Sequence, residues 1–190
     1  MFTYVSDTSH WEPWMHEYRY GLILIMPPPE VMAFVDELRA RYDPRSASHC
    51  QAHISLSEPL PRPLTPELLE EVRGILAGIE PFEITYGPLR TFPPYPGVTY
   101  RVEPEERFFA LRRSVEGASL FQGSEFKRSG RKPHMTIAEF LPDIEASERL
   151  REELQGKVPE GSFLCDRLEY IVPNRDFWFE RVLELPLGGG

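Results

Sequence analysis

Several features are scarce or absent in this chain of 190 residues. Its two cysteines, Cys50 and Cys165, are too few for the disulfide framework of a small secreted domain, so we expect a reducing, cytoplasmic setting. The longest apolar run, residues 21–26, is far shorter than the roughly 20 residues that cross a bilayer. The first residues lack a basic start followed by an apolar segment, so neither a secretory signal nor a membrane partner is predicted.

Basic residues are also fewer than acidic residues. Lys and Arg number 21 against 30 Asp and Glu, which gives a net charge of −9. Such a chain is a poor binder of long duplex nucleic acid, whose phosphates require cationic partners. A nucleotide or an RNA end can still be held in a local basic cleft. The length fits one domain, or two small lobes that share a core, and we expect a monomer.

The hydrophobic pattern predicts two similar halves, each reading strand, helix, strand, helix, strand. Residues 1–17 have no clear period and are predicted to form an irregular N-terminal arm, residues 18–187 one two-lobed domain, and residues 188–190 a flexible tail. A rigid proline-rich loop, residues 91–97, is predicted between the halves. The predicted strands are 18–26, 51–57, 82–86, 98–102, 133–140, 162–172 and 177–185. The predicted helices are 29–42, 66–79 with Thr65 as N-cap, 105–115 and 144–155.

Two matching strings occupy equivalent places in the two halves. Residues 53–56 read His-Ile-Ser-Leu, and residues 134–137 read His-Met-Thr-Ile. In a strand, alternate side chains point to opposite faces, so the histidine and the hydroxyl residue share one face and the apolar pair enters the core. The imidazole and hydroxyl then lie about 6–7 Å apart along the strand. Two such strands facing one another predict an acid/base site for a phosphate that needs no metal.

On these strings the sequence resembles the 2H phosphoesterases, a family that includes 2′-5′ RNA ligase-like proteins and cyclic phosphodiesterases. The family carries two His-x-Thr/Ser-x motifs roughly eighty residues apart, and the separation of His53 and His134 fits. A strand at residues 21–25 that runs into prolines and a helix is also similar to the family. The resemblance covers residues 19–187. Ser55 stands where threonine is commoner, but both residues supply a hydroxyl.

The resemblance implies a two-lobed, pseudo-symmetric α+β fold, with two mostly antiparallel sheets facing a central cleft and helices outside. It also implies cleavage or formation of a phosphodiester through a 2′,3′-cyclic phosphate, with no metal and no cofactor. His53 and His134 are the predicted catalytic pair, one as base and one as acid. We assign them jointly, because the base of cleavage becomes the acid of ligation. The hydroxyls of Ser55 and Thr136 are predicted to donate hydrogen bonds to the phosphate oxygens.

Four further residues are candidates for substrate binding. Lys132 shares strand parity with His134, whereas Arg131 has the opposite parity but lies at a loop–strand junction. One of these two residues is expected to supply positive charge to the phosphate. Phe92 and Tyr95, in the proline-rich loop, are candidates to stack on a nucleobase. Phe177 and its two successors are interpreted as hairpin packing.

Two alternatives stay open at this point. The first is a non-catalytic module of the same fold that binds a nucleotide or an RNA end. The intact histidine pair disfavours it, because binding alone needs no paired acid and base. The second is a metal-dependent hydrolase that uses His49, Cys50 and His53. The helical spacing that would bring these ligands together is opposed by Pro44 and by the strand pattern.

Overall fold

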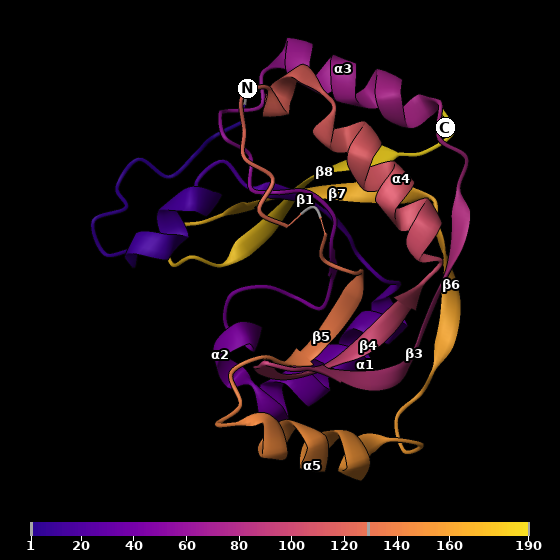
Figure 1. Ribbon diagram of the computed structural model, residues 1–190. Helices are drawn as coiled ribbons and strands as arrows, with labels where there is room; N and C mark the ends of the chain where they lie inside the picture. The colour runs from indigo at the N-terminus through magenta and orange to yellow at the C-terminus, as the bar shows by residue number, and fades with distance from the viewer. Residues whose placement is uncertain (1, 129, 190) are drawn as a thin grey trace.

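One continuous sheet organises the molecule (Figure 1). The structure is a computed structural model that describes residues 2–128 and 130–189. Its sheet has eight strands in the order β6-β3-β4-β5-β2-β1-β7-β8, and each neighbouring pair is antiparallel. The strands are β1 Leu22–Ile25, β2 Ile54–Ser55, β3 Phe82–Phe92, β4 Tyr95–Glu103, β5 His134–Ala138, β6 Gly161–Cys165, β7 Arg167–Pro173 and β8 Phe179–Pro186. The helices are α1 Pro29–Tyr42, α2 Pro44–Ala47, α3 Pro66–Ala77, α4 Glu105–Glu116 and α5 Ile144–Leu154, with 3-10 helices η1 Pro13–Tyr18 and η2 Ser119–Phe121.

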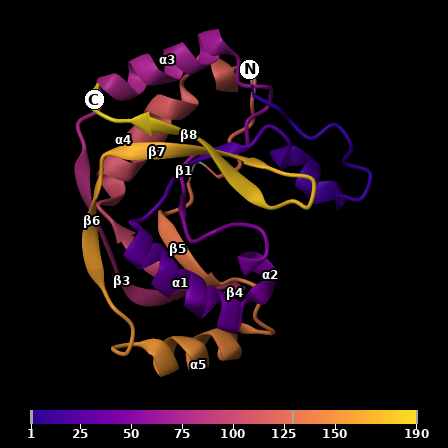
Figure 2. The same cartoon turned by 180° about the vertical axis from the view of Figure 1, so that it is seen from behind.

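The α+β class and the pseudo-symmetry of the halves are confirmed. Outward from the central pair β5-β2, strand β4 corresponds to β1, β3 to β7, and β6 to β8. The two expected sheets are joined into one, because β2 pairs with β1 on one side and with β5 on the other. The sheet curls, so that β1, β7 and β8 lie at one level and β3, β4 and β5 at another (Figures 1 and 2).

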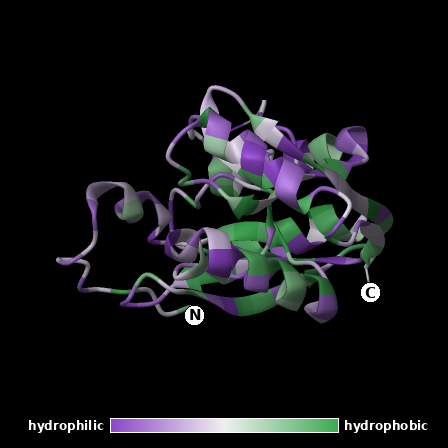
Figure 3. Ribbon diagram, turned by 90° about the horizontal axis from the view of Figure 1, so that it is seen from below, coloured by the Kyte–Doolittle hydropathy of each residue, from purple (hydrophilic) through white to green (hydrophobic). Residues whose placement is uncertain are grey.

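Helices cover the two halves of the sheet separately. Helix α3 contacts α4 and β8 of one half, and α4 also reaches β4, whereas α1 and α5 contact β5, β4 and β3 of the other half. Local sequence fixes α3: the Thr65 side chain accepts the Leu68 amide hydrogen, and Pro66 occupies the first turn. Apolar residues gather on the strands and the inner helix faces, and hydrophilic residues lie on the outer surfaces (Figure 3).

Two predicted strands are shorter in the structure: 18–26 is reduced to β1, because Tyr18 ends η1, and 51–57 is reduced to β2. Three further predicted segments differ in kind. The proline-rich loop is the tip of a hairpin, because β3 and β4 continue pairing to Phe92 and Tyr95. The predicted strand 162–172 is two strands: β6 pairs with β3, whereas β7 pairs with β1 and β8. The predicted irregular arm includes most of η1, which ends at Tyr18, and packs against the domain through buried Trp11 and Met15. No helix in the described part of the chain combines the length and the apolar character that a membrane span requires.

The residues at the two chain ends belong to the predicted arm and tail. Met1 and Gly190, which belong to the predicted arm and tail, lie outside the described residues. Gly188, also in the predicted tail, donates its amide hydrogen to the carbonyl of Leu76 in α3. The division into arm, domain and tail remains a prediction.

Candidate active site

The two matching strings lie side by side at the centre of the sheet. Strand β2 pairs antiparallel with β5 in the register Ile54↔Met135. By the same register His53 lies opposite Thr136, and Ser55 lies opposite His134. Each imidazole therefore faces the hydroxyl residue of the other strand, at the short separation of cross-strand neighbours. The intervening residue Ile54 is fully buried, as the strand parity predicts.

All four polar residues of the strings line one cavity of about 480 Å³. They are half-buried, and the apolar residues between them fill the core on the other side of the sheet. A cavity of this size is in the range of small-molecule sites. The structure therefore brings together the four site residues predicted from the motifs: His53, Ser55, His134 and Thr136.

Hydrogen bonding fixes the same tautomer on both histidines. The Nδ1 atom of His53 lies 2.7 Å from the carbonyl oxygen of Gln51, and Nδ1 of His134 lies 2.8 Å from that of Lys132. A carbonyl oxygen only accepts, so each Nδ1 carries the hydrogen. Each Nε2 consequently keeps its lone pair available to the cavity. In both cases the accepting carbonyl lies two residues before the histidine. The same hydrogen bond therefore occurs in both halves of the pseudo-symmetric fold.

The cavity wall makes both imidazoles less basic than usual. Burial lowers the pKa of His53 to about 4, and the positive charge of Arg39 acts in the same direction. Burial also lowers the pKa of His134, and Arg90 contributes to the decrease. Desolvation disfavours the charged imidazolium in each case. Both rings are therefore largely neutral at pH 7 in the free protein, and an anion bound between them would favour protonation.

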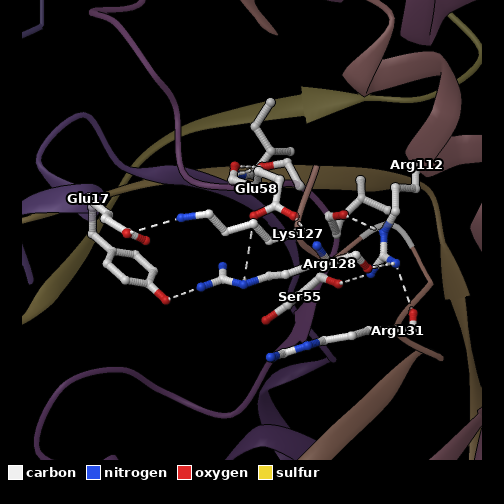
Figure 4. Close-up of polar contacts among 11 residues, drawn as sticks. Glu17, Ser55, Glu58, Arg112, Lys127, Arg128 and Arg131 are labelled. Atoms are coloured by element: carbon white, nitrogen blue, oxygen red, sulfur yellow. Dashed lines mark hydrogen bonds and ion pairs between the residues drawn. The ribbon is translucent and has the colours of Figure 1, made fainter. Parts of the chain in front are cut away.

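A buried arginine supports each motif strand. Arg39, from α1, donates to the carbonyl of Cys50, three residues before His53. Arg112, from α4, donates to the carbonyl of Arg131, three residues before His134. The two arginines are 3% and 4% exposed, and both belong to the helix that follows the first strand of their half. The second arginine also donates to the carbonyls of Ser55, Leu56 and Arg128 (Figure 4).

Positive charge reaches the cavity in spite of the acidic composition. Arg131 lines the cavity beside Ser55, and its guanidinium has no ion-pair partner among the residues that the structure describes (Figure 4). Arg128 also lines the cavity and pairs with the buried carboxylate of Glu58. The lining residues include five arginines and one carboxylate: Arg39, Arg45, Arg112, Arg128, Arg131 and Glu139.

Three predicted binding residues do not line the cavity. The Lys132 ammonium is 3.0 Å from the Glu105 carboxylate, and the side chain does not line the cavity. Strand parity fails there because β5 begins only at His134. Tyr95 is 74% exposed at the hairpin tip. Phe92 packs its ring 5.3 Å from that of His134, so it contacts the site from the side without lining the cavity.

The alternative metal site is not assembled. Within the described ranges, no three His, Cys, Asp or Glu residues are grouped so that they could hold a metal ion. Burial raises the pKa of the Cys50 thiol to about 12, which opposes the thiolate that a metal would need. The Nδ1 of His53 is already bound to a carbonyl. Among His49, Cys50 and His53, then, the donor set required for zinc is missing.

Sequence reasoning missed one whole side of the cavity. Its lining includes a set of rings from η1, the loop before β2, the β7–β8 turn and the start of β8: Trp14, Tyr18, His49, Phe177 and Phe179. The interpretation of Phe177 and Phe179 as hairpin packing is therefore incomplete. The available signal was the aromatic spacing at residues 11, 14 and 18, which suits a short helix with one packed face.

Comparisons with known proteins agree with this architecture. Residues 27–177 match the family model described as the 2′-5′ RNA ligase superfamily. Two curated proteins are each named "Putative phosphoesterase". The one from Oceanobacillus iheyensis is 31% identical over 73% of this chain and 81% of its own length. The one from Bacillus cytotoxicus is 30% identical over 67% of this chain and 74% of its own length.

Solved structures share the fold at low sequence identity. The crystal structure of E. coli LigT complexed with 3′-AMP superposes with a TM-score of 0.56 at 15% identity and covers 87% of this chain and 96% of that one. The crystal structure of TT0787 of Thermus thermophilus gives a TM-score of 0.55 at 16% identity, over 88% of this chain and 97% of that one. These similarities support the curled α+β fold described above.

Proposed function

This chain belongs to the 2′-5′ RNA ligase superfamily, and from that premise we propose that it is a metal-independent phosphodiesterase. Its substrates are 2′,3′-cyclic phosphates or 2′-5′ linkages of nucleotides or RNA ends. Membership of the superfamily and the names of its relatives support phosphoesterase activity in general, without naming a substrate. One observation supports the more specific proposal: His53, directly before β2, and His134, the first residue of its partner strand β5, line one cavity and hold the same tautomer.

The geometry suits in-line displacement at phosphorus. One neutral Nε2 accepts the proton of the attacking hydroxyl or water, and the other imidazole, once protonated, donates to the leaving oxygen. The hydroxyls of Ser55 and Thr136 lie on the same face and donate to the non-bridging oxygens, whose charge grows in the transition state. Arg131 adds positive charge at the rim of the cavity. Ligation is the same chemistry reversed, with an RNA 5′-hydroxyl as nucleophile.

The site chemistry favours a nucleotide or an RNA end over a long nucleic acid. The cavity is local and carries most of its charge as arginine, whereas the chain as a whole has a net charge of −9. Long nucleic acids bind through many phosphate contacts along a positive surface. A single terminal phosphate needs only the local cluster. The 3′-AMP named in the LigT complex is a ligand of that kind.

Turnover in the presence of a chelator tests the function directly. We expect the purified protein to open 2′,3′-cyclic nucleotides, or to cleave 2′-5′ linked dinucleotides, at the same rate with and without EDTA. The reason is that the two imidazoles supply the base that activates the nucleophile and the acid that protonates the leaving oxygen. No metal-bound water is then needed as the nucleophile. The measurement is product formation by chromatography. Loss of activity in EDTA that added metal restores would support the metal-dependent alternative, and binding without turnover would support the non-catalytic module.

The pH dependence provides a second check. The active form of the free protein carries one proton on the histidine pair, so kcat/KM rises as the first proton leaves and falls as the second leaves. Because burial lowers both pKa values, to about 4 for His53, we expect a bell-shaped kcat/KM with its optimum below pH 6.5. Bound phosphate favours imidazolium, so the alkaline limb of kcat is expected at higher pH. An alkaline limb of kcat/KM above pH 7 would contradict the assignment.

A further inference from the structure

We propose that the N-terminal segment completes a nucleobase-binding subsite in the catalytic cavity, with Trp14 as its stacking surface. The proposal rests on the function proposed above, since it names the part of the substrate that lies beyond the reacting phosphate. We call the rings of Trp14, Tyr18, His49, Phe177 and Phe179 the aromatic wall. All five line the cavity that contains the histidine pair.

The aromatic wall is organised around Phe177. Its ring centroid lies 5.2 Å from those of Trp14 and Phe179, 5.4 Å from that of His49 and 6.1 Å from that of Tyr18. These four contacts are edge-to-face, with interplanar angles between 72° and 89°. Edge-to-face packing fixes the rings, and although Phe177 itself is buried, this packing leaves the Trp14 ring partly exposed. The wall is therefore rigid and still able to accept another flat ring.

The backbone holds Phe177 in an unusual conformation. Its φ is +61°, in the left-handed region that non-glycine residues rarely adopt. The Asn174 side chain stabilises this turn by accepting the amide hydrogens of Asp176 and Trp178. The indole nitrogen of Trp11 also donates to the carbonyl of Arg175 in the same turn. Strain of this kind persists only where surrounding contacts enforce it, and it is common at binding sites.

Trp14 differs from the other indole of the arm. Trp11 is 6% exposed and packs against Phe177, so it already attaches the arm to the domain. Trp14 is 41% exposed, although its nitrogen donates to Glu12 over 2.8 Å and its ring meets Phe177 edge to face. Attaching the arm to the domain does not explain why the Trp14 ring is held in place by contacts and is still exposed. Stacking of a base would cover it, and such stacking tolerates any base.

Further contacts link the aromatic wall to the catalytic strands. His49 precedes His53 by four residues, and its ring lies 6.1 Å from that of Trp14. On the other side, the guanidinium of Arg128 lies 5.3 Å from the Tyr18 ring centroid and also binds the Tyr18 hydroxyl. Arg128 lies in the loop that leads to the second motif. Because the aromatic wall and the histidine pair line the same cavity, a base at the wall and a phosphate at the histidines can belong to one ligand.

The subsite is built partly from residues outside the family match. Trp14 and Tyr18 precede residue 27, where the match to the family model begins. The N-terminal segment is also joined to the loop before β5 by an ion pair between Glu17 and Lys127, 3.5 Å apart (Figure 4). The segment thus adds a recognition surface to a catalytic centre that the matched region supplies.

The kinetic test separates base recognition from catalysis. The substrates are 2′,3′-cyclic AMP and the 2′,3′-cyclic phosphate of methyl riboside, which has no base. For Trp14→Ala we expect KM for the nucleotide to rise about 10-fold with little change in kcat, and the base-free substrate to be unaffected. Trp14→Phe keeps a ring and should restore most of the affinity. An equal effect of Trp14→Ala on both substrates would overturn the proposal.

A binding test does not depend on turnover. We expect adenosine, which has no phosphate, to quench indole fluorescence in the native protein and in Trp178→Phe, because Trp178 does not line the cavity. The quenching should be lost in Trp14→Phe. Quenching that persists in Trp14→Phe would overturn the subsite. If adenosine quenches Trp14 but no cyclic phosphate is opened, the subsite stands and the proposed reaction fails.

Discussion

Replacing either His53 or His134 with alanine is expected to lower kcat for a 2′,3′-cyclic nucleotide by at least about 10²-fold. Each imidazole presents a lone pair on Nε2 to the cavity, so removal of either one deletes the acid or the base. The water that enters the vacated space is a weaker acid and a weaker base. Initial rates at saturating substrate, measured from pH 4 to pH 8, provide the comparison.

The double variant makes this test more specific. Groups that act as a unit have non-additive effects, so removing both histidines should cost little more than removing one. The single variants should also lose opposite limbs of the bell-shaped pH profile. His16→Ala is the matched control, since His16 is exposed in η1 and does not line the cavity. Native-like rates in both single variants would refute the paired mechanism.

Sequence pattern predicted the histidine pair because strand parity is local. The faces of Ile54 and Met135 follow from alternation, and both residues are fully buried as expected. The register that places His53 opposite Thr136 is not local, since it depends on β2 and β5 meeting across about eighty residues of chain. Strand parity also predicts that Lys132 shares the face of His134. Parity does not apply there, because Lys132 precedes β5, and its ammonium pairs with Glu105.

The rest of the cavity needed the tertiary fold. The aromatic wall combines the N-terminal arm with the β7–β8 turn, and no single segment carries its pattern. Tyr95 was a reasonable candidate for stacking by composition. It lies at the exposed tip of a hairpin because β3 and β4 continue past the predicted loop. The helical pattern does not distinguish Arg39 and Arg112 from exposed arginines, because the carbonyls that they bind come from segments outside their own helices.

Arg112 is expected to be the most important residue for stability at the site. The residue is 4% exposed, and its guanidinium donates to carbonyls of the first motif, at Ser55 and Leu56, and of the loop before the second, at Arg128 and Arg131. Removing it takes a donor from the Leu56 carbonyl, whose bond is buried, and from three part-buried carbonyls. A buried acceptor that loses its donor costs about 1–3 kcal/mol, and part-buried ones cost less. For Arg112→Met we expect a loss of roughly 3–5 kcal/mol in the free energy of unfolding, measured by urea denaturation.

The same change should reduce activity in the folded fraction. Arg112 sets the position of the chain three residues before His134, and small displacements of a catalytic group have large effects on rate. Arg112→Lys retains the charge but replaces a planar fork with a single ammonium, so we expect only partial recovery of stability and of kcat. Arg113→Met, on the exposed face of the same helix, is the matched control. If Arg112→Met unfolds at the same urea concentration as Arg113→Met, the buried guanidinium does not hold the two motif strands together.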